Sequence, residues 1–532
     1  MARPGTPIPK GFRQPPRGAS VDLDFERALD LQAAGREGEA EALFTAILKK
    51  APLHFGALYG LGVIRLQQGE PEAALSLLRT ATACRPASAE AWNALANTLQ
   101  ALGRHEEAAE RYRRALALQP RFAYGHNNLG NSYLALGRVE DAAASFRTAA
   151  TLVPKLAVAH SNLGNALMEL GRPDEALQCY QAATELNPDV GGIHNNAGKA
   201  LVVLNRHEEA AARFVRASDL DPSLAQARLN LALARLSLGD YTAAWPDYEA
   251  RWQISTYSRP REYPQPLWDG RADLAGKTIL LYFEQGLGDT IQFARYVPLL
   301  AQRGARVLLE GPRPLLRLFA SLAGAAALLA PGDPPPDFDF HAPLLSLPLA
   351  FQTTLETIPG GVPYLQAPPV RTNYSIGLCW AGNPDNPTDR ERSIPLRALV
   401  PLLRIPGASF LSLQKVLREG DEEILAQFGN IDVARIRDCT DFADTAALVA
   451  GLDLVIAVDT SLAHLAGAMA RPVWVLLKFS AHWAWLRHRQ DSPWYPTARL
   501  FRQPRPGDWS SVIEEAAKTL AENRTSNSLP AL

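Results

Sequence analysis

The fold of the second half of the chain is decided by the stretch V-I-A-V-D-T-S-L-A-H-L-A-G at residues 455–467. Its β-branched run predicts a buried strand, and the small polar residues Asp459, Thr460 and Ser461 predict a tight turn into a helix. Any of the three could cap that helix. Because the first amides of a helix and its dipole attract anions, we expect a nucleotide diphosphate, or a related activated phosphate, at this turn.

The residues before this stretch continue the order of strand, loop and helix. Composition predicts strands at 375–380 and 409–413 and a helix at 442–450. Ligands of open parallel sheets bind at the carboxyl ends of the strands, so we expect the residues that come after these strands to join the anion site. They are Trp380, Gly382, Asn383, Arg392 and Ser393 after the first strand, and Gln414 and Lys415 after the second.

A similar unit precedes this one along the chain. Its predicted elements alternate, with strands at 278–283 and 306–310 and helices at 291–303 and 313–322. This spacing implies a parallel, doubly wound sheet. The loop after the first strand carries candidate ligand-contacting residues, namely Gln285, Gly286, Gly288 and Asp289. Its glycines would let a ligand approach the backbone closely.

Two residues of this unit are candidates for proton transfer. Asp289, at the predicted helix start, is either an N-cap or a general base toward an acceptor hydroxyl. His341 lies close to where another strand should end at the cleft. A single histidine is more often structural, so its catalytic interpretation is the lesser one.

The first half of the chain repeats with a period of 34 residues. The repeat is visible in four registers: proline at 52, 86, 120, 154, 188 and 222; glycine at 35, 69, 103, 137, 171 and 239, with Asn205 at the remaining step; alanine at 40, 74, 108, 142, 176, 210 and 244; and a bulky residue at 44, 78, 112, 146, 180, 214 and 248. The pattern predicts one helix pair per cycle. Glycine or asparagine ends the first helix in a left-handed conformation, alanine permits close approach, and the bulky side chain fills the gap.

These registers resemble the tetratricopeptide repeat, which implies an all-α superhelix of seven repeats over residues 21–258 with a concave binding face. Asparagines recur in two registers three residues apart, a spacing that places them on one helix face. They are Asn128, Asn162, Asn196 and Asn230 in one register, and Asn97, Asn131 and Asn165 in the other. They resemble the asparagine ladder of the O-linked N-acetylglucosamine transferases and would clamp a peptide backbone. The alternative is that they solvate the face or bond neighbouring helices.

The remaining segments set the predicted boundaries. Residues 1–20 are rich in proline and glycine and suit a flexible arm, and residues 524–532 suit a disordered tail. Between them we expect a rigid connector at 259–276 and two α/β units at 277–370 and 371–523. Three tryptophans are expected to pack the last repeat against the next part of the chain, namely Trp245, Trp252 and Trp268.

The composition indicates which kinds of binding partner the protein is not expected to have, and in which cellular compartment we expect it. The net charge of −1 gives no reason to expect binding to nucleic acid or to an acidic membrane, and no apolar run is long enough to span a bilayer. The N-terminus lacks the apolar region of a signal peptide. The four cysteines form no C-x-x-C pair, which suits a reducing compartment. A cytoplasmic protein is the expectation.

Further motifs point to one family. They are G-L-G-D-T-I-Q at 286–292, W-A-G-N at 380–383, R-S-I-P at 392–395 and D-T-S-L-A-H-L-A-G-A at 459–468. With them, residues 278–505 resemble bacterial glycosyltransferases of the heptosyltransferase type, which have two Rossmann-like units in a GT-B fold. The resemblance implies that the first unit faces the acceptor and the second binds the nucleotide sugar.

The resemblance also implies roles for single residues. Asp289 would be the base, and Arg392 would help to hold the diphosphate. The D-T-x-x-x-H segment would contact the donor phosphates through Asp459, Thr460, Ser461 and His464. No D-x-D metal motif is evident at the cleft, so we expect a metal-independent transfer with the nucleotide sugar as co-substrate and no further cofactor.

Tetratricopeptide repeats joined to a GT-B transferase resemble protein O-glycosyltransferases, including bacterial enzymes that modify flagellin. The leading hypothesis is therefore transfer of a sugar to Ser or Thr of a protein recruited by the repeats. Two alternatives stay open: an inactive repeat scaffold that only holds a ligand, and a transferase that acts on an envelope saccharide.

Overall fold

The computed structural model describes residues 19–256, 260–386 and 389–525. Most of the predicted N-terminal arm and C-terminal tail therefore lies outside the described residues. The chain divides into two compact units, residues 1–200 and 201–532. The division falls within the repeats and not at the predicted boundary after residue 258, because the last repeat shares a core with the α/β units.

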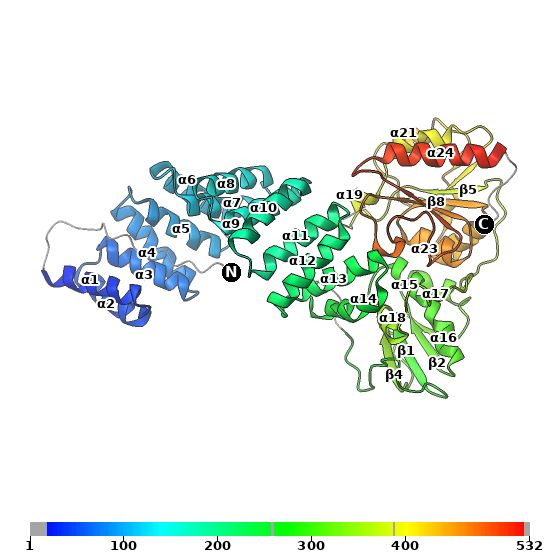
Figure 1. Cartoon of the computed structure of the whole chain (residues 1–532), viewed down its shortest axis with the longest axis horizontal. Coiled ribbons are helices and arrows are strands. Elements are labelled where there is room, and N and C mark those ends of the chain that lie inside the picture. Colours follow the sequence, from blue (N-terminus) through cyan, green and yellow to red (C-terminus); the bar gives the residue numbers. More distant parts are fainter. Residues whose placement is uncertain (1–18, 257–259, 387–388, 526–532) are drawn as a thin grey trace. The chain divides into compact units, whose positions relative to one another are not determined.

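The first unit consists of paired helices, each of which packs against the next along the chain (Figure 1). Its helices are α1 (Ala19–Ala33), α2 (Glu37–Lys50), α3 (Phe55–Gln67), α4 (Pro71–Cys84), α5 (Ala89–Ala101), α6 (His105–Leu118), α7 (Ala123–Ala135), α8 (Val139–Leu152), α9 (Ala157–Glu169), α10 (Pro173–Leu186) and most of α11 (Gly191–Val203).

The predicted registers take the expected positions in these pairs. The register glycines have φ between 68° and 83°, and Asn205 has φ of 60°, so the left-handed turn after the first helix of each pair is confirmed. Every register alanine is fully buried. The bulky side chains are buried too, and some occupy the space that a Cβ on a neighbouring glycine would need, as the Phe146 ring does at Gly130.

The second unit begins with the end of α11, and it contains the second helix of the sixth repeat and the whole of the seventh. It continues through α12 (His207–Leu220), α13 (Ala225–Leu238), α14 (Tyr241–Tyr248) and the 3-10 helix η1 (Glu249–Gln253). Trp245 donates its Nε1–H to the Thr353 carbonyl at 2.9 Å, so this tryptophan packs against the α/β part as expected. Trp268 packs instead on Phe351, and Trp252 donates to Glu249 within η1.

Two parallel sheets come next, which confirms the predicted fold class of an all-α repeat superhelix followed by two Rossmann-like units. The first has the order β3-β2-β1-β4, with strands β1 (Thr278–Tyr282), β2 (Arg306–Glu310), β3 (Ala325–Leu329) and β4 (Phe340–Pro343). The second has the order β10-β9-β8-β5-β6-β7, with strands β5 (Ile376–Cys379), β6 (Phe410–Ser412), β7 (Ile431–Asp432), β8 (Leu454–Val458), β9 (Val473–Leu477) and β10 (Ala498–Arg502).

The strand order of the second sheet locates the ligand crevice. In chain order its strands run 6-5-4-1-2-3, the Rossmann arrangement, so the direction of winding reverses between β5 and β8. The loops after these two strands carry Gly382 and Asp459. The first sheet reverses between β1 and β4, and the loop after β1 carries Asp289.

Further helices complete this unit: α16 (Val297–Gln302), α17 (Arg313–Phe319), α18 (Leu347–Ala350), α19 (Asp389–Arg392), α20 (Val400–Leu403), α21 (Asp421–Leu425), α22 (Phe442–Ala450) and α24 (Trp509–Thr525). The helix predicted at 291–303 starts earlier than expected, as α15 (Leu287–Phe293), and reaches α16 through a 3-10 turn. None of the helices within the described residues is long and apolar enough to cross a membrane.

Candidate active site

Two helix N-termini, one from each α/β unit, meet at the carboxyl ends of the sheets. Helix α15 follows β1, and α23 (Ser461–Ala468) follows β8 (Figure 1). A Cβ on Gly288 would lie 2.9 Å from His464 Cδ2 and 3.5 Å from Ser461 Cα. Glycine at 288 therefore lets the two loops approach to contact distance, and this approach brings the G-L-G-D and D-T-S motifs together.

The start of α23 lacks the side-chain cap that the sequence predicts. Thr460 occupies the N-cap position without a cap hydrogen bond, and its buried Oγ1 has no partner of normal geometry among the described residues. Asp459 is held elsewhere, since its Oδ1 accepts a hydrogen bond from Trp485 Nε1 at 2.8 Å. The Ala463 N–H donates to the Thr460 carbonyl at 3.0 Å, and no side chain caps the helix start, which is a favourable arrangement for an anion at the amides before Ala463.

Asp289 lies at the third position of α15, not before the helix. Its Oδ2 accepts a hydrogen bond from the Gly286 backbone N–H at 3.2 Å. Burial raises the pKa of the carboxyl, and the Asp459 carboxylate raises it further, while His482 and the Gly286 N–H act in the opposite direction. A raised pKa makes Asp289 a stronger base toward a hydroxyl.

His464 is enclosed on the inner side of α23. Its Nδ1 is 3.0 Å from the Tyr495 hydroxyl, and its ring centroid is 5.2 Å from that of Trp485. Burial lowers the pKa of His464 to about 4, against the opposing effect of Asp459. The imidazole is therefore neutral near pH 7, so it can offer a hydrogen bond to a phosphate but not a positive charge.

The loop after β5 supplies a cation beside the same turn. Arg392 Nη1 donates to the Asp459 carbonyl at 3.1 Å, and Ser393 Oγ accepts from the Gly382 N–H at 3.0 Å. Both side chains are anchored by the buried Asp389, which accepts from Arg392 Nε at 3.3 Å and from Ser393 Oγ at 2.9 Å. Arg392 thus faces the start of α23 with a fixed guanidinium.

Other candidates of the second unit support the loop itself. Gln414 Oε1 accepts from the backbone N–H groups of Trp380 and Ala381, at 3.2 and 2.9 Å. Trp380 is buried and donates to Asp421 at 3.0 Å. Lys415 Nζ donates to the Cys439 carbonyl at 2.7 Å. Gln414 therefore holds the backbone at the start of the loop, while Trp380 and Lys415 are bonded to neighbouring segments.

Two more candidates lie on the loops themselves. Asn383 is exposed, and its Oδ1 accepts a hydrogen bond from the Asp385 N–H at 3.1 Å in the turn after Gly382. In the first unit, Gln285 donates to the Tyr248 hydroxyl of the last repeat at 3.1 Å. The buried Arg251 fixes the same loop through Glu284, with both N···O distances 3.0 Å.

The structure does not place His341 at this site. His341 pairs with Leu280 inside β4, so its side chain is on the face of Tyr282, whereas Ile279 and Leu281 pack on the core that includes α15. The imidazole lies 5.1 Å from the Tyr263 ring and 6.0 Å from that of Tyr282, between centroids. The connector residue Tyr263 packs on His341 at this face of the sheet, so the geometry gives His341 a packing role, and its catalytic role stays a prediction.

The asparagine ladder forms hydrogen bonds between successive repeats. Asn128 Nδ2 donates to Asn97 Oδ1 at 3.0 Å, and Asn196 Nδ2 donates to Asn165 Oδ1 at 3.1 Å. Asn162 Nδ2 donates to Asn131 Oδ1 at 3.4 Å and to Asn127 Oδ1 at 3.0 Å, whereas Asn230 Oδ1 accepts from Gln226 within α13 at 3.0 Å. All seven predicted ladder asparagines stay partly exposed, so the bonds between helices and contact with a peptide are compatible.

Several residues of the site were not predicted from the sequence. The buried Asp389 forms an ion pair with Arg418 behind the glycine loop, and Trp485 holds Asp459. His482 is exposed near Asp289, which it influences electrostatically. The cluster H-W-A-W at 482–485, in the loop after β9, was the available indication for two of them.

The fold and the site define a class: helical repeats followed by a transferase-type pair of α/β units. Residues 25–89, 93–157, 157–190 and 195–260 match tetratricopeptide repeat families. Residues 419–485, which include the α23 turn and the tryptophan cluster, match glycosyltransferase family 9 (heptosyltransferase). The chain therefore carries tetratricopeptide repeats and a glycosyltransferase family 9 domain.

The chain is also similar to a curated protein. Protein FlbA of Caulobacter vibrioides is 27% identical over 336 residues, which cover 56% of this chain and 55% of FlbA. The chain thus spans about half the length of the curated relative that it matches.

Among solved structures, Pseudomonas aeruginosa PilF (25% identity, TM-score 0.36) covers 38% of this chain and 93% of its own. The Thermus thermophilus repeat protein TTC0263 (27% identity, TM-score 0.29) covers 34% of this chain and 99% of its own.

Proposed function

We propose that the protein is a glycosyltransferase that moves a sugar from a nucleotide-activated donor to a Ser or Thr hydroxyl of a protein held by the repeats. The observation that carries this proposal is the approach of Gly288 to His464 and Ser461. It sets a candidate base, Asp289, opposite a helix start suited to a diphosphate. The family 9 match over the α23 turn supports the same interpretation.

In the proposed reaction, the acceptor hydroxyl oxygen bonds to the anomeric carbon as the bond from that carbon to the donor phosphate breaks. Asp289 accepts the hydroxyl proton. The nucleoside diphosphate leaves with the bonding electron pair, and its charge is met by Arg392 and by the amides of α23. Neutral His464 would donate a hydrogen bond to it. This division of work needs no metal, and none is proposed.

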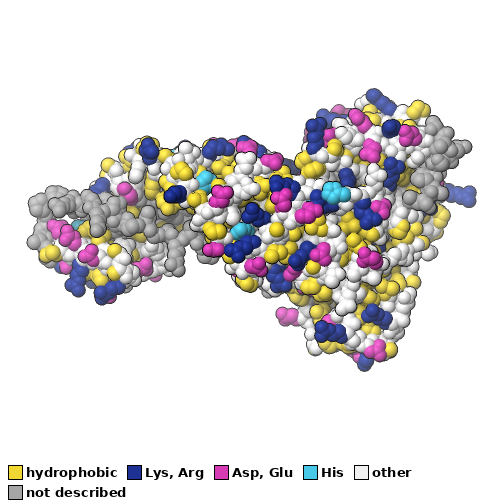
Figure 2. Space-filling model, in the orientation of Figure 1, with side chains coloured by type: hydrophobic (Ala, Val, Ile, Leu, Met, Phe, Trp, Pro, Cys, Tyr) yellow, Lys and Arg dark blue, Asp and Glu magenta, His cyan; other side chains and the backbone are white. Residues whose placement is uncertain are grey.

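The acceptor is proposed to be a polypeptide because the repeats carry the asparagine ladder. A carboxamide has two donors and two acceptor lone pairs. Each bond between repeats uses one Nδ2–H and one Oδ1, and the Tyr112 and Tyr180 hydroxyls also donate to Asn97 Oδ1 and Asn165 Oδ1. The ladder could therefore hold a peptide backbone without reading its side chains. Flagellin is a candidate acceptor, on the resemblance of the layout alone. Mixed charge over the face in Figure 2 suits a protein partner better than a nucleic acid.

We also propose a cytoplasmic location. The four cysteines are unpaired, at positions 84, 179, 379 and 439, which suits a reducing compartment.

The test is release of nucleoside diphosphate from a panel of nucleotide sugars in the presence of candidate acceptors. Asp289→Asn should lower kcat by about 10² to 10⁴, the usual contribution of a general base, and leave donor affinity unchanged. Asp269→Asn, on an exposed residue of the connector, is the matched control. Unchanged kcat in Asp289→Asn would remove it as the base. No turnover by the wild-type chain with any donor would favour the scaffold alternative.

A further inference from the structure

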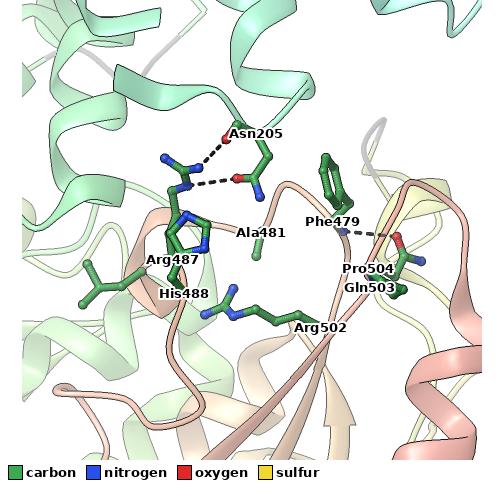
Figure 3. A pocket seen from close by; sticks show the side chains of 9 residues that line it. Asn205, Phe479, Ala481, Arg487, His488, Arg502, Gln503 and Pro504 are labelled. Atoms are coloured by element: carbon green, nitrogen blue, oxygen red, sulfur yellow. Dashed lines mark hydrogen bonds between the residues drawn. The ribbon is translucent and has the colours of Figure 1, made fainter. Parts of the chain in front are cut away.

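A cavity of about 260 Å³ lies in the second unit, beside the carboxyl ends of β9 and β10 (Figure 3). One wall is Asn205, in the turn between α11 and α12, and the others come from the loop after β9 and from the end of β10. The lining residues used below are Asn205, Ala481, Arg487, His488, Arg502 and Gln503.

The main feature of this cavity is an incompletely neutralised cation. Arg502 donates to backbone carbonyls only, those of Trp485 and of Arg489, and no carboxylate among the described residues lies within ion-pair distance of it. Burial lowers the pKa of Arg502 to about 10, with Asp459 opposing that effect from further away. In Figure 3 its guanidinium reaches into the space between Ala481 and His488. Arg502 is half-buried, and removing a charge from water in this way costs free energy that a nearby anion would offset.

The groups around Arg502 add donors. Gln503 is buried, and its Nε2 has no hydrogen-bond partner among the described residues, while its Oε1 accepts from the Phe479 N–H at 3.1 Å. Arg487 and His488 form the facing wall. Among the residues that the structure describes, the only carboxylate paired with Arg487 is the exposed Glu208, at 2.9 Å. The cavity is therefore rich in donors and positive charge.

The loop that forms this wall is held in an unusual backbone conformation. Leu486 and His488 have φ of 52° and 53°, a region that residues with a side chain rarely adopt. Arg487, between them, is fixed by Asn205, whose Oδ1 accepts from Arg487 Nε at 3.1 Å and whose carbonyl accepts a second bond. Residues with strained backbone angles are found most often at binding and active sites, because contacts with the surrounding structure keep them in that conformation.

We propose that this cavity binds an oxyanion, the phosphate or carboxylate group of a small molecule, on Arg502. The site is separate from the α23 turn, because the fully buried Trp485 stands between them: its carbonyl accepts from Arg502 while its Nε1–H is donated to Asp459. The inference does not depend on the proposed sugar transfer. An occupied site would fix the loop that holds Asp459.

Anomalous scattering from tungstate, a tetrahedral oxyanion, locates the site in crystals of the full chain. We expect a peak within hydrogen-bond distance of the Arg502 guanidinium. A second peak at the start of α23 would be resolved separately. The oxyanion site at Arg502 and the proposed donor site at α23 are therefore tested independently. A map with tungstate elsewhere, or with none, and nothing at Arg502 overturns the proposal.

Calorimetric titration of the full chain with inorganic phosphate, and separately with acetate, provides the measurement in solution. Arg502→Gln should weaken binding at this site at least tenfold. Ala481→Phe, which fills the cavity and keeps Arg502, should do the same and carries the test if Arg502→Gln does not fold. Arg505→Gln, an exposed arginine on the same loop, is the control and should match wild type.

Tighter phosphate binding would assign a phosphorylated ligand, and tighter acetate binding a carboxylate. Equal affinities of wild type, Arg502→Gln and Ala481→Phe for both anions would overturn the site.

Discussion

Asp289 is the residue on which the proposed chemistry depends. Two of its neighbours shift its pKa in opposite directions, so replacing them should shift the pH profile in opposite directions. The base must be ionised, so kcat/KM should fall as pH drops through the pKa of Asp289, which burial holds above the usual aspartate range. Asp459 raises that pKa and His482 lowers it. Asp459→Asn should therefore move the acid limb of the pH profile to lower pH, and His482→Gln should move it to higher pH.

The measurement is kcat/KM against pH for the three proteins under one buffer series. Shifts in the same direction for both variants, or none in either, would mean that the acid limb reports another group. His464 is not that group near neutral pH, because burial keeps its pKa at about 4.

The sequence predicted which residues lie together at the turn better than it predicted what each of these residues does. Residues Asp459, Thr460, Ser461 and His464 do gather opposite Asp289, since a strand-turn-helix order fixes where they lie. The sequence did not reveal that Trp485 holds Asp459 beside the uncapped Thr460, or that Tyr495 encloses His464. Both residues approach from distant parts of the chain. The face on which His341 lies was not predictable, because the residues of a strand alternate between the two faces of the sheet and the sequence did not fix the register.

The contact between α15 and α23 is the element on which the cleft depends. Gly288→Ala would place a Cβ 2.9 Å from His464 Cδ2, so one of the helix starts must shift. Since small misplacements of reacting groups are costly, we expect kcat to fall about tenfold to a hundredfold. Gly429→Ala, where an added Cβ meets nothing within 4 Å, serves as the control in steady-state kinetics. Wild-type kcat in Gly288→Ala would contradict the proposed role of this contact.

The turn between α11 and α12 explains why asparagine replaces glycine in one register. Asn205 has the left-handed φ of the other turns, and its side chain also binds Arg487. Asn205→Gly keeps the turn and loses the Oδ1 hydrogen bond, so we expect a loss of about 1 kcal/mol in the stability of the second unit. Thermal unfolding of this variant, beside the reciprocal Gly171→Asn, measures it. Equal melting of Asn205→Gly and wild type would show that the contact contributes nothing.

The asparagine ladder is the element proposed to hold the acceptor. Replacing Asn128 and Asn162 by alanine removes hydrogen bonds that a peptide would share, so acceptor affinity should fall about tenfold. Asn187→Ala, in an exposed turn, is the matched control. Binding of the acceptor, measured by fluorescence anisotropy, distinguishes them. Unchanged affinity in the double variant would assign the ladder to helix packing alone.

The whole molecule is organised differently from the predicted domain scheme. The period of 34 residues identified every repeat, but it could not reveal that the last one shares a core with the α/β units. Tyr241 accepts a hydrogen bond from Trp494 at 2.8 Å, and the Trp245 and Trp483 rings lie 5.8 Å apart. Such contacts join residues that are far apart in the chain, and no local pattern predicts them.

This organisation predicts which truncations fold. Deleting residues 21–258 removes Tyr241, Trp245 and Tyr248 from the core of the second unit, so that variant should aggregate or melt well below wild type. Deleting residues 21–200 should leave a folded protein that binds the donor. Thermal melting and donor titration of both variants check this. If the variant that lacks residues 21–200 modifies the same acceptor as the wild-type chain, the envelope-saccharide alternative would be favoured.

The central claim, sugar transfer to a protein held by the repeats, is tested most directly by intact-mass measurement of the protein that co-purifies with the chain. We predict that this partner carries the mass increment of a sugar when it is expressed with the wild-type chain, and that the increment is absent with Asp289→Asn. A partner with the same mass in both cases would contradict the claim.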